Sequence, residues 1–182
     1  MKVLVLYTTV DGNTEAVANA IAEKTGADVS KIVRVSKRHA YGIDWLRIWF
    51  EVMFKRRPGI FPFKHDPRDY DLIFIGTPVW FNRYNPAFDT LFQVIKIYDR
   101  KIAIFSTGAT DKQKALDKFA KKLQDSVILG RYHCVEPIFE DDEESTKKIL
   151  DEAAEWAQGV ADTAAKMIEE EEFERRKTIY KF

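Results

Sequence analysis

The stretch that decides the fold is VLVLYTTVDGNTEAVANAIAEK, residues 3–24. Its first five residues, VLVLY, form a continuous apolar run, which is typical of a strand with both faces covered. Its second half carries small and apolar residues at helical spacing, at Ala16, Val17, Ala20 and Ile21. Asn13 or Thr14 can cap this helix and Gly26 can end it. The stretch therefore predicts a buried strand that passes through one short polar loop into a helix.

The same signals recur along the rest of the chain. Continuous apolar runs at 71–76 (DLIFIG) and 101–106 (KIAIFS) predict two more buried strands, and weaker runs predict strands at 28–35 and 127–135. Helical spacing predicts helices over 43–57, 87–96 and 112–123 and from about residue 145 onward. Strands that alternate with helices form a parallel sheet covered on both sides. We therefore expect an α/β fold, a three-layer doubly wound sandwich around a five-stranded parallel sheet.

Length and composition describe one globular domain. The chain has 182 residues, 46% hydrophobic and 32% charged, which suits a single core and leaves too little for two. We expect a domain over residues 1–168 and a charged C-terminal extension over 169–182. The favoured interpretation of the extension is a solvated continuation of the last helix. The alternative is an arm laid over the ligand site or a neighbour and anchored by Phe173, Ile179, Tyr180 and Phe182.

The rarer residues exclude several classes of protein. Cys134 is the only cysteine, so no internal disulfide can form, and the three histidines lack the spacing of metal ligands. No secretory signal and no stretch long enough to span a bilayer is found in the sequence, so we expect a cytoplasmic protein.

Charge is segregated along the chain although the formal net charge is zero. Basic residues concentrate between 31 and 68, and acidic residues dominate from 140 onward. The favoured interpretation is solvated faces, and the alternative is a dipolar surface that orients a partner. No basic motif with interleaved aromatic residues is present, so nucleic-acid binding is not expected.

The loop TTVDGNT, residues 8–14, has the chemistry of an anion site. Gly12 lets the backbone approach a ligand closely, and the amides that open the following helix attract negative charge. The hydroxyls of Thr8, Thr9 and Thr14 add donors. Asp11 opposes an anion, so it must point away, cap the turn or bind a hydroxyl of the ligand. The alternative is a capped turn with no ligand.

Two further loops follow predicted strands and should meet the first at one edge of the sheet. GTPVWFNRYNP, residues 76–86, gathers aromatic side chains at Trp80, Phe81 and Tyr84, which a flat ring stacked on them would explain. The alternative is that they pack down over the sheet edge. In the loop after the fourth strand, small residues can bring backbone amides against the edge of such a ring: Ser106, Thr107, Gly108 and Ala109.

Together these three loops resemble those of the flavodoxin family over about residues 2–167. The resemblance implies strand order 2-1-3-4-5 and the cofactor FMN. The family's phosphate loop, [ST]xTGNT, falls on Thr9, Asp11, Gly12, Asn13 and Thr14. By the same resemblance the isoalloxazine lies against Pro78, Val79, Trp80, Phe81 and Asn82, and its pyrimidine edge meets Thr107, Gly108 and Ala109. The Asp-Gly turn and the aromatic loop ending near Tyr84 are also similar to those of flavodoxin-type protoporphyrinogen oxidases.

The resemblance implies an FMN protein that transfers electrons, either as a carrier or as a flavin-dependent oxidoreductase acting on a quinone-like or porphyrinogen-like substrate. Its partner would be a redox protein or a small electron acceptor. No general acid or base is assigned. The strongly acidic charge of small carrier flavodoxins is missing here. The alternative is a flavodoxin-like module without FMN that binds partners or forms oligomers.

The predicted helix over 43–57 is apolar on nearly all sides. A helix lying on one face of a sheet needs an apolar stripe of only about 100°. The favoured interpretation is burial at a subunit interface formed by Trp45, Trp49, Phe50 and Phe54. Packing under the basic loop that follows is the second interpretation, and docking on a membrane surface is the least favoured one.

Overall fold

The computed structural model describes residues 1–35, 49–50, 54, 57–79, 82–108, 113–123, 125–135 and 143–179. Five parallel strands form one sheet in the order β2-β1-β3-β4-β5. The strands are β1 (Val3–Tyr7), β2 (Asp28–Lys31), β3 (Leu72–Pro78), β4 (Lys101–Thr107) and β5 (Val127–Cys134). The helices are α1 (Asn13–Thr25), the short 3₁₀ helix η1 (Pro67–Asp69), α3 (Ala87–Val94), α4 (Gln113–Ala120) and α5 (Glu143–Ile179). The predicted fold class and strand order are confirmed.

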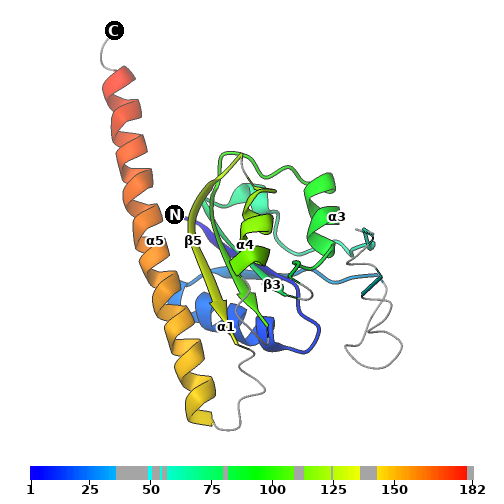
Figure 1. Ribbon diagram of the computed structural model, residues 1–182. Coiled ribbons are helices and arrows are strands. Elements are labelled where there is room, and N and C mark those ends of the chain that lie inside the picture. The colour runs from blue at the N-terminus through cyan, green and yellow to red at the C-terminus, as the bar shows by residue number, and fades with distance from the viewer. Residues whose placement is uncertain are drawn as a thin grey trace.

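Helices cover both faces of the sheet (Figure 1). Because side chains alternate along a strand, Val5 faces one layer and its neighbours Leu4 and Leu6 face the other. The Val5 side packs against α1 and α5, and the Leu4 side packs against α3 and α4. Strands β1, β3 and β4 are buried on both faces, which is why they have continuous apolar sequences.

Parallel register brings the carboxyl ends of the strands to one edge of the sheet. Tyr7 is aligned with Gly76, and Gly76 is aligned with Phe105. The loops after β1, β3 and β4 therefore leave the sheet at the same edge, at the lower side of Figure 1. In a doubly wound sheet the reversal of strand order between β1 and β3 makes this edge the place where ligands bind.

Strand β2 is shorter than the predicted strand over 28–35. It ends at Lys31, and Arg34 forms an antiparallel bridge with Ile60 instead. Backbone hydrogen bonds run from the Val35 amide to the Gly59 carbonyl and from the Phe61 amide to the Val33 carbonyl. Ile32 still donates its amide to the Tyr7 carbonyl of β1 at 2.8 Å, so the chain leaves the sheet only after Ile32 and then pairs with residues 59–61.

Two predicted helices are also shorter than expected. Helix α3 ends at Val94, because Ile95 is extended and both Ile95 and Ile97 turn into the core. Helix α4 ends at Ala120, where the amides of Lys122 and Leu123 donate to carbonyls three residues back and tighten the turn.

Helix α5 is much longer than the sheet that it covers. Alanines at 153, 157, 161 and 164 are buried on its inner face, where their small side chains allow close packing. From Glu169 to Thr178 its residues are exposed, and the helix continues past the sheet in Figure 1. Glu171 pairs with Lys101, the first residue of β4, at 2.9 Å. The extension thus runs past the amino edge of the sheet, so the alternative of an arm over the ligand edge is wrong for residues 169–179.

Most of the predicted helix over 43–57, including Trp45, lies outside the described residues. Of the proposed interface residues, Trp49 and Phe50 form an edge-to-face pair with ring centroids 5.1 Å apart, and Phe50 stacks on Phe54 at 5.5 Å. Phe50 is 52% exposed and Phe54 is 65% exposed. The subunit interface stays a prediction. Among the described residues, none of the helices has the length and apolar character needed to cross a membrane.

Candidate functional site

The loop between β1 and α1 presents an open helix N-terminus. Gly12 caps α1 with φ 98°, a left-handed conformation that favours glycine, and as a glycine it offers no side chain to the helix amides. The first intrahelical hydrogen bond runs from the Ala16 amide to the Gly12 carbonyl at 2.9 Å. The amides of Asn13, Thr14 and Glu15 therefore precede the hydrogen-bond ladder, and a helix start of this kind attracts anions.

Two amides of this loop are bonded by the loop's own side chains. The Gly12 amide donates to Thr9 Oγ1 at 3.0 Å, and the Asn13 amide donates to Asp11 Oδ1 at 3.2 Å. The sequence allowed Asp11 to point away, to cap the turn or to bind the ligand. The structure shows that its carboxylate caps the turn. An incoming anion must compete with Asp11 for the Asn13 amide.

Thr8 supplies a buried hydroxyl at the end of β1. Thr8 is 2% exposed, and its amide donates to the Gly76 carbonyl at 3.0 Å. Its Oγ1 has no hydrogen-bond partner within the part of the chain that the structure describes. A buried polar atom left unpaired costs about 1–3 kcal/mol, so such an atom at a ligand edge calls for a polar partner. An oxygen-rich anion fits this loop.

The three loops meet at the edge of the sheet. The hydroxyls of Thr14 and Thr107 lie 2.8 Å apart, which joins the start of α1 to the end of β4. The Val79 amide donates to the Thr107 carbonyl at 2.8 Å, and a Cβ on Gly108 would come 3.3 Å from the Val79 carbonyl oxygen. The structure therefore brings together the predicted phosphate loop, the end of β3 and the end of β4.

The predicted residues of the second loop are described only in part. Pro78 ends β3 and Val79 is buried, whereas Trp80 and Phe81 lie outside the described residues, as does Ala109 of the third loop. Asn82 is exposed and has φ 57°, the left-handed conformation that asparagine tolerates better than most residues. Ser106 is buried and its Oγ lies 2.9 Å from His133 Nδ1, so β5 already engages this hydroxyl.

Tyr84 lies apart from the phosphate loop. Its ring stacks on Phe119 of α4 with centroids 4.5 Å apart, and its hydroxyl donates to Asp89 Oδ1 at 2.8 Å. Burial, followed by the charge of Asp89 and the hydrogen bond to it, raises the pKa of Tyr84 far above its ordinary value. The structure thus turns Tyr84 toward α3 and α4, on the Leu4 side of the sheet, rather than toward Thr14 and Thr107.

Sequence patterns did not reveal a polar network beside the helix N-terminus. The Tyr7 hydroxyl donates to Glu15 Oε1 at 2.8 Å, and Lys31 Nζ lies 2.7 Å from Glu15 Oε2. Burial opposes ionisation of Glu15, but hydrogen bonds from Lys31 and Tyr7 and the charge of Lys31 outweigh it and lower its pKa. Tyr7 and Lys31 are register partners on adjacent strands, a relationship that becomes visible only once β1 and β2 are paired.

Known proteins are similar to this chain in sequence. The family model described as Flavodoxin matches residues 2–133. An uncharacterised protein of Methanocaldococcus jannaschii is 28% identical over 141 residues, which are 74% of this chain and 75% of that protein.

Two solved structures have the same fold. The crystal structure of a flavoprotein from Lactobacillus acidophilus in complex with FMN aligns with TM-score 0.63 and 23% identity, covering 81% of this chain and 97% of that one. Oxidised flavodoxin 2 from Bacillus cereus aligns with TM-score 0.53 and 19% identity, covering 90% of this chain and 99% of that one.

Proposed function

This chain belongs to the flavodoxin family, and from that premise we propose that it binds FMN at the carboxyl edge of its sheet and transfers electrons. FMN supplies the redox chemistry when it is bound. The protein's own part is to hold the phosphate, orient the ring and keep water from it.

The observation that carries the proposal is the neutral donor set at the start of α1. Asp11 holds the Asn13 amide, but the amides of Thr14 and Glu15 precede the helix hydrogen-bond ladder, and Thr8 contributes a buried hydroxyl that lacks a partner among the described residues. No lysine or arginine stands in residues 8–14. A phosphate monoester is held here by amides, threonine hydroxyls and the helix dipole, a combination suited to a single anionic group.

The ring has a place beside this loop. The end of β3 at Val79 and the end of β4 at Thr107 and Gly108 adjoin the start of α1 through the contacts described above. By family resemblance, residues 78–82 flank the isoalloxazine and residues 107–109 meet its pyrimidine edge. The positive φ of Asn82 supports a specialised turn in the flanking loop.

Reconstitution with FMN is the first experiment. The full chain is mixed with FMN and passed through gel filtration, and we expect flavin absorbance to elute with the protein. Gly12→Val should lower FMN affinity at least tenfold, because valine is strained at φ 98°. Gly159→Ala, on an exposed turn of α5 with no atom within 4 Å of the added Cβ, is the matched control. A colourless wild-type eluate would overturn the proposal.

A second candidate is a partner-binding module without FMN. It is motivated by Asp11, whose carboxylate already occupies the Asn13 amide. It predicts that FMN fails to bind both the wild type and Asp11→Asn, whereas the FMN hypothesis predicts binding to both.

Turnover separates the two redox roles. If the protein is a reductase of quinone-like or porphyrinogen-like substrates, steady-state oxidation of reduced nicotinamide in the presence of a quinone proceeds without an added reductase. If it is a carrier, turnover requires the reductase.

A further inference from the structure

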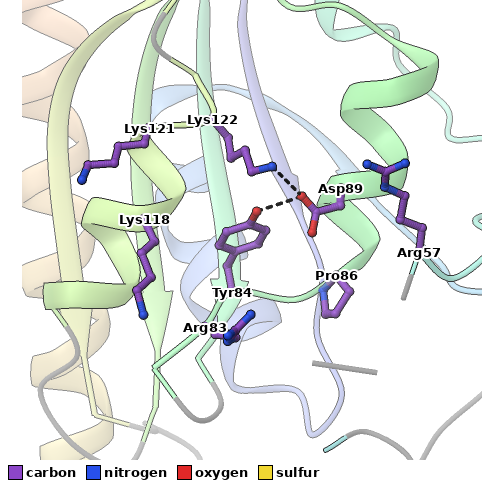
Figure 2. A pocket seen from close by; sticks show the side chains of 8 residues that line it. All are labelled: Arg57, Arg83, Tyr84, Pro86, Asp89, Lys118, Lys121 and Lys122. Carbon is purple, nitrogen blue, oxygen red and sulfur yellow. Dashed lines mark hydrogen bonds and ion pairs between the residues drawn. The ribbon is translucent and has the colours of Figure 1, made fainter. Parts of the chain in front are cut away.

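A basic pocket lies on the Leu4 side of the sheet, between α3 and α4. Its volume is about 270 Å³. Five cationic side chains line it together with one carboxylate, one phenol and one proline: Arg57, Arg83, Lys118, Lys121, Lys122, Asp89, Tyr84 and Pro86. Figure 2 shows these side chains coming from separate parts of the chain, with Arg57 and Lys122 on opposite sides of Asp89.

Asp89 is the internal counter-ion of this pocket. It accepts the hydroxyl of Tyr84 at 2.8 Å and pairs with Lys122 at 3.4 Å. Both side chains point toward it in Figure 2. Its side chain is 18% exposed, so one partly buried carboxylate faces a group of cations.

The other cations remain available to a ligand. Within the described ranges, Arg57, Arg83 and Lys121 make no ion pair, and Lys118 donates only a long hydrogen bond of 3.5 Å to the Asn82 carbonyl. Lys121 and Lys122 follow the end of α4, where cations stabilise a helix terminus, but this does not explain the two arginines from other segments. Concave walls lined by one sign of charge concentrate ions of the opposite sign.

We propose that this pocket binds a small oligoanion, a molecule with at least two phosphate or carboxylate groups. Arginine forks bind both groups in a bidentate manner, and lysines serve them as point charges. The volume lies just below the roughly 300–1,000 Å³ of drug-sized sites, which suits a compact anion rather than a protein surface. The site goes beyond the proposed FMN function and does not depend on it. Lys118 connects it to Asn82, in the loop expected to flank the flavin.

Calorimetric titration at constant ionic strength tests the proposal, with pyrophosphate and citrate as the two probes. Arg57→Gln combined with Arg83→Gln should weaken binding at least tenfold. The matched control is Lys147→Gln combined with Lys148→Gln, which removes two exposed cations from α5 and should change affinity less than twofold. Binding of pyrophosphate alone identifies a phosphate site, and binding of both probes identifies a general oligoanion site.

Asp89→Asn gives a test in the opposite direction. Asparagine can still accept the Tyr84 hydroxyl, but the internal negative charge is gone, so the affinity for either probe should rise about threefold to tenfold. Loss of affinity in this variant would overturn the proposal, as would equal effects of the arginine pair and the control pair. Absence of heat with both probes at millimolar concentration would also overturn it.

Titrations are repeated with FMN present, because pyrophosphate can also occupy the loop at residues 8–14. Binding that disappears with FMN and ignores the arginine pair belongs to that loop and overturns the pocket assignment. If FMN itself fails to bind, the arginine and Asp89 variants still decide the pocket, so the two proposals fail separately.

Discussion

The hydroxyls of Thr14 and Thr107 lie 2.8 Å apart although the two residues are 93 positions apart in the chain. Both residues are buried, so this contact ties the start of α1 to the end of β4 without help from water. The same polar contact therefore stabilises the fold and holds two loops of the predicted ligand site together.

Thr107→Val should lower the free energy of unfolding by about 1–3 kcal/mol, because it leaves the buried Thr14 hydroxyl without this partner. Urea denaturation measures the change. The double variant Thr14→Val, Thr107→Val should lose less than the sum of the two single variants, since it removes both partners. Strict additivity would contradict a direct bond.

Gly76→Ala should destabilise the fold by roughly 1–3 kcal/mol, because its Cβ would clash with Cζ of Phe105. Phe105→Leu in the same chain should recover part of the loss by making space. Gly159→Ala is the opposite control: nothing lies within 4 Å of its Cβ, and alanine in a helix is favoured by up to about 1 kcal/mol. Thermal unfolding checks the expected order of stability: Gly159→Ala highest, the double variant Gly76→Ala, Phe105→Leu next, and Gly76→Ala lowest.

Asp11→Asn should tighten FMN binding roughly fivefold, about 1 kcal/mol, because it removes a negative charge that competes for the Asn13 amide. Fluorescence titration of FMN measures the affinity. Glu174→Gln, far along α5, is the charge-matched control. Weaker binding of Asp11→Asn would mean that the carboxylate contacts the ligand.

Acid stability should depend on Glu15. Its folded-state pKa is lower than the ordinary value of 4.5, so its contribution is present above pH 4.5 and is lost as pH falls through the lowered pKa. The Glu15 side chain is 36% exposed, so the contribution is below about 1 kcal/mol. Glu15→Gln should make the acid limb of a stability–pH curve less steep, which urea denaturation at a series of pH values measures.

Local patterns predicted the elements that are buried on both faces. The runs at 3–7, 71–76 and 101–106 became β1, β3 and β4, because continuous apolar sequence suits a sheet covered by two layers. The predicted end of β2 at residue 35 was wrong, because Val33 and Val35 pair with residues around Ile60. A local window does not contain the partner of such a long-range pair.

At two positions of the candidate site the backbone conformation agrees with the residue type. Gly12 adopts the left-handed turn at the start of α1, and Asn82 has the positive φ that its residue type permits. The direction of Tyr84 could not be read from its loop, because an aromatic side chain at a sheet edge can turn to either layer and here Phe119 and Asp89 fix it. The cations of the basic pocket are dispersed from 57 to 122 in sequence, so only the packing of α3 and α4 gathers them.

The overhang of α5 affects how the subunit interface should be tested. At about 1.5 Å per residue, a helix of 37 residues is roughly 55 Å long. A single copy that carries such a rod diffuses more slowly than a sphere of 21.2 kDa and elutes early from a sizing column. Early elution would then imitate a dimer, so light scattering or sedimentation equilibrium, which report mass independently of shape, should decide the stoichiometry.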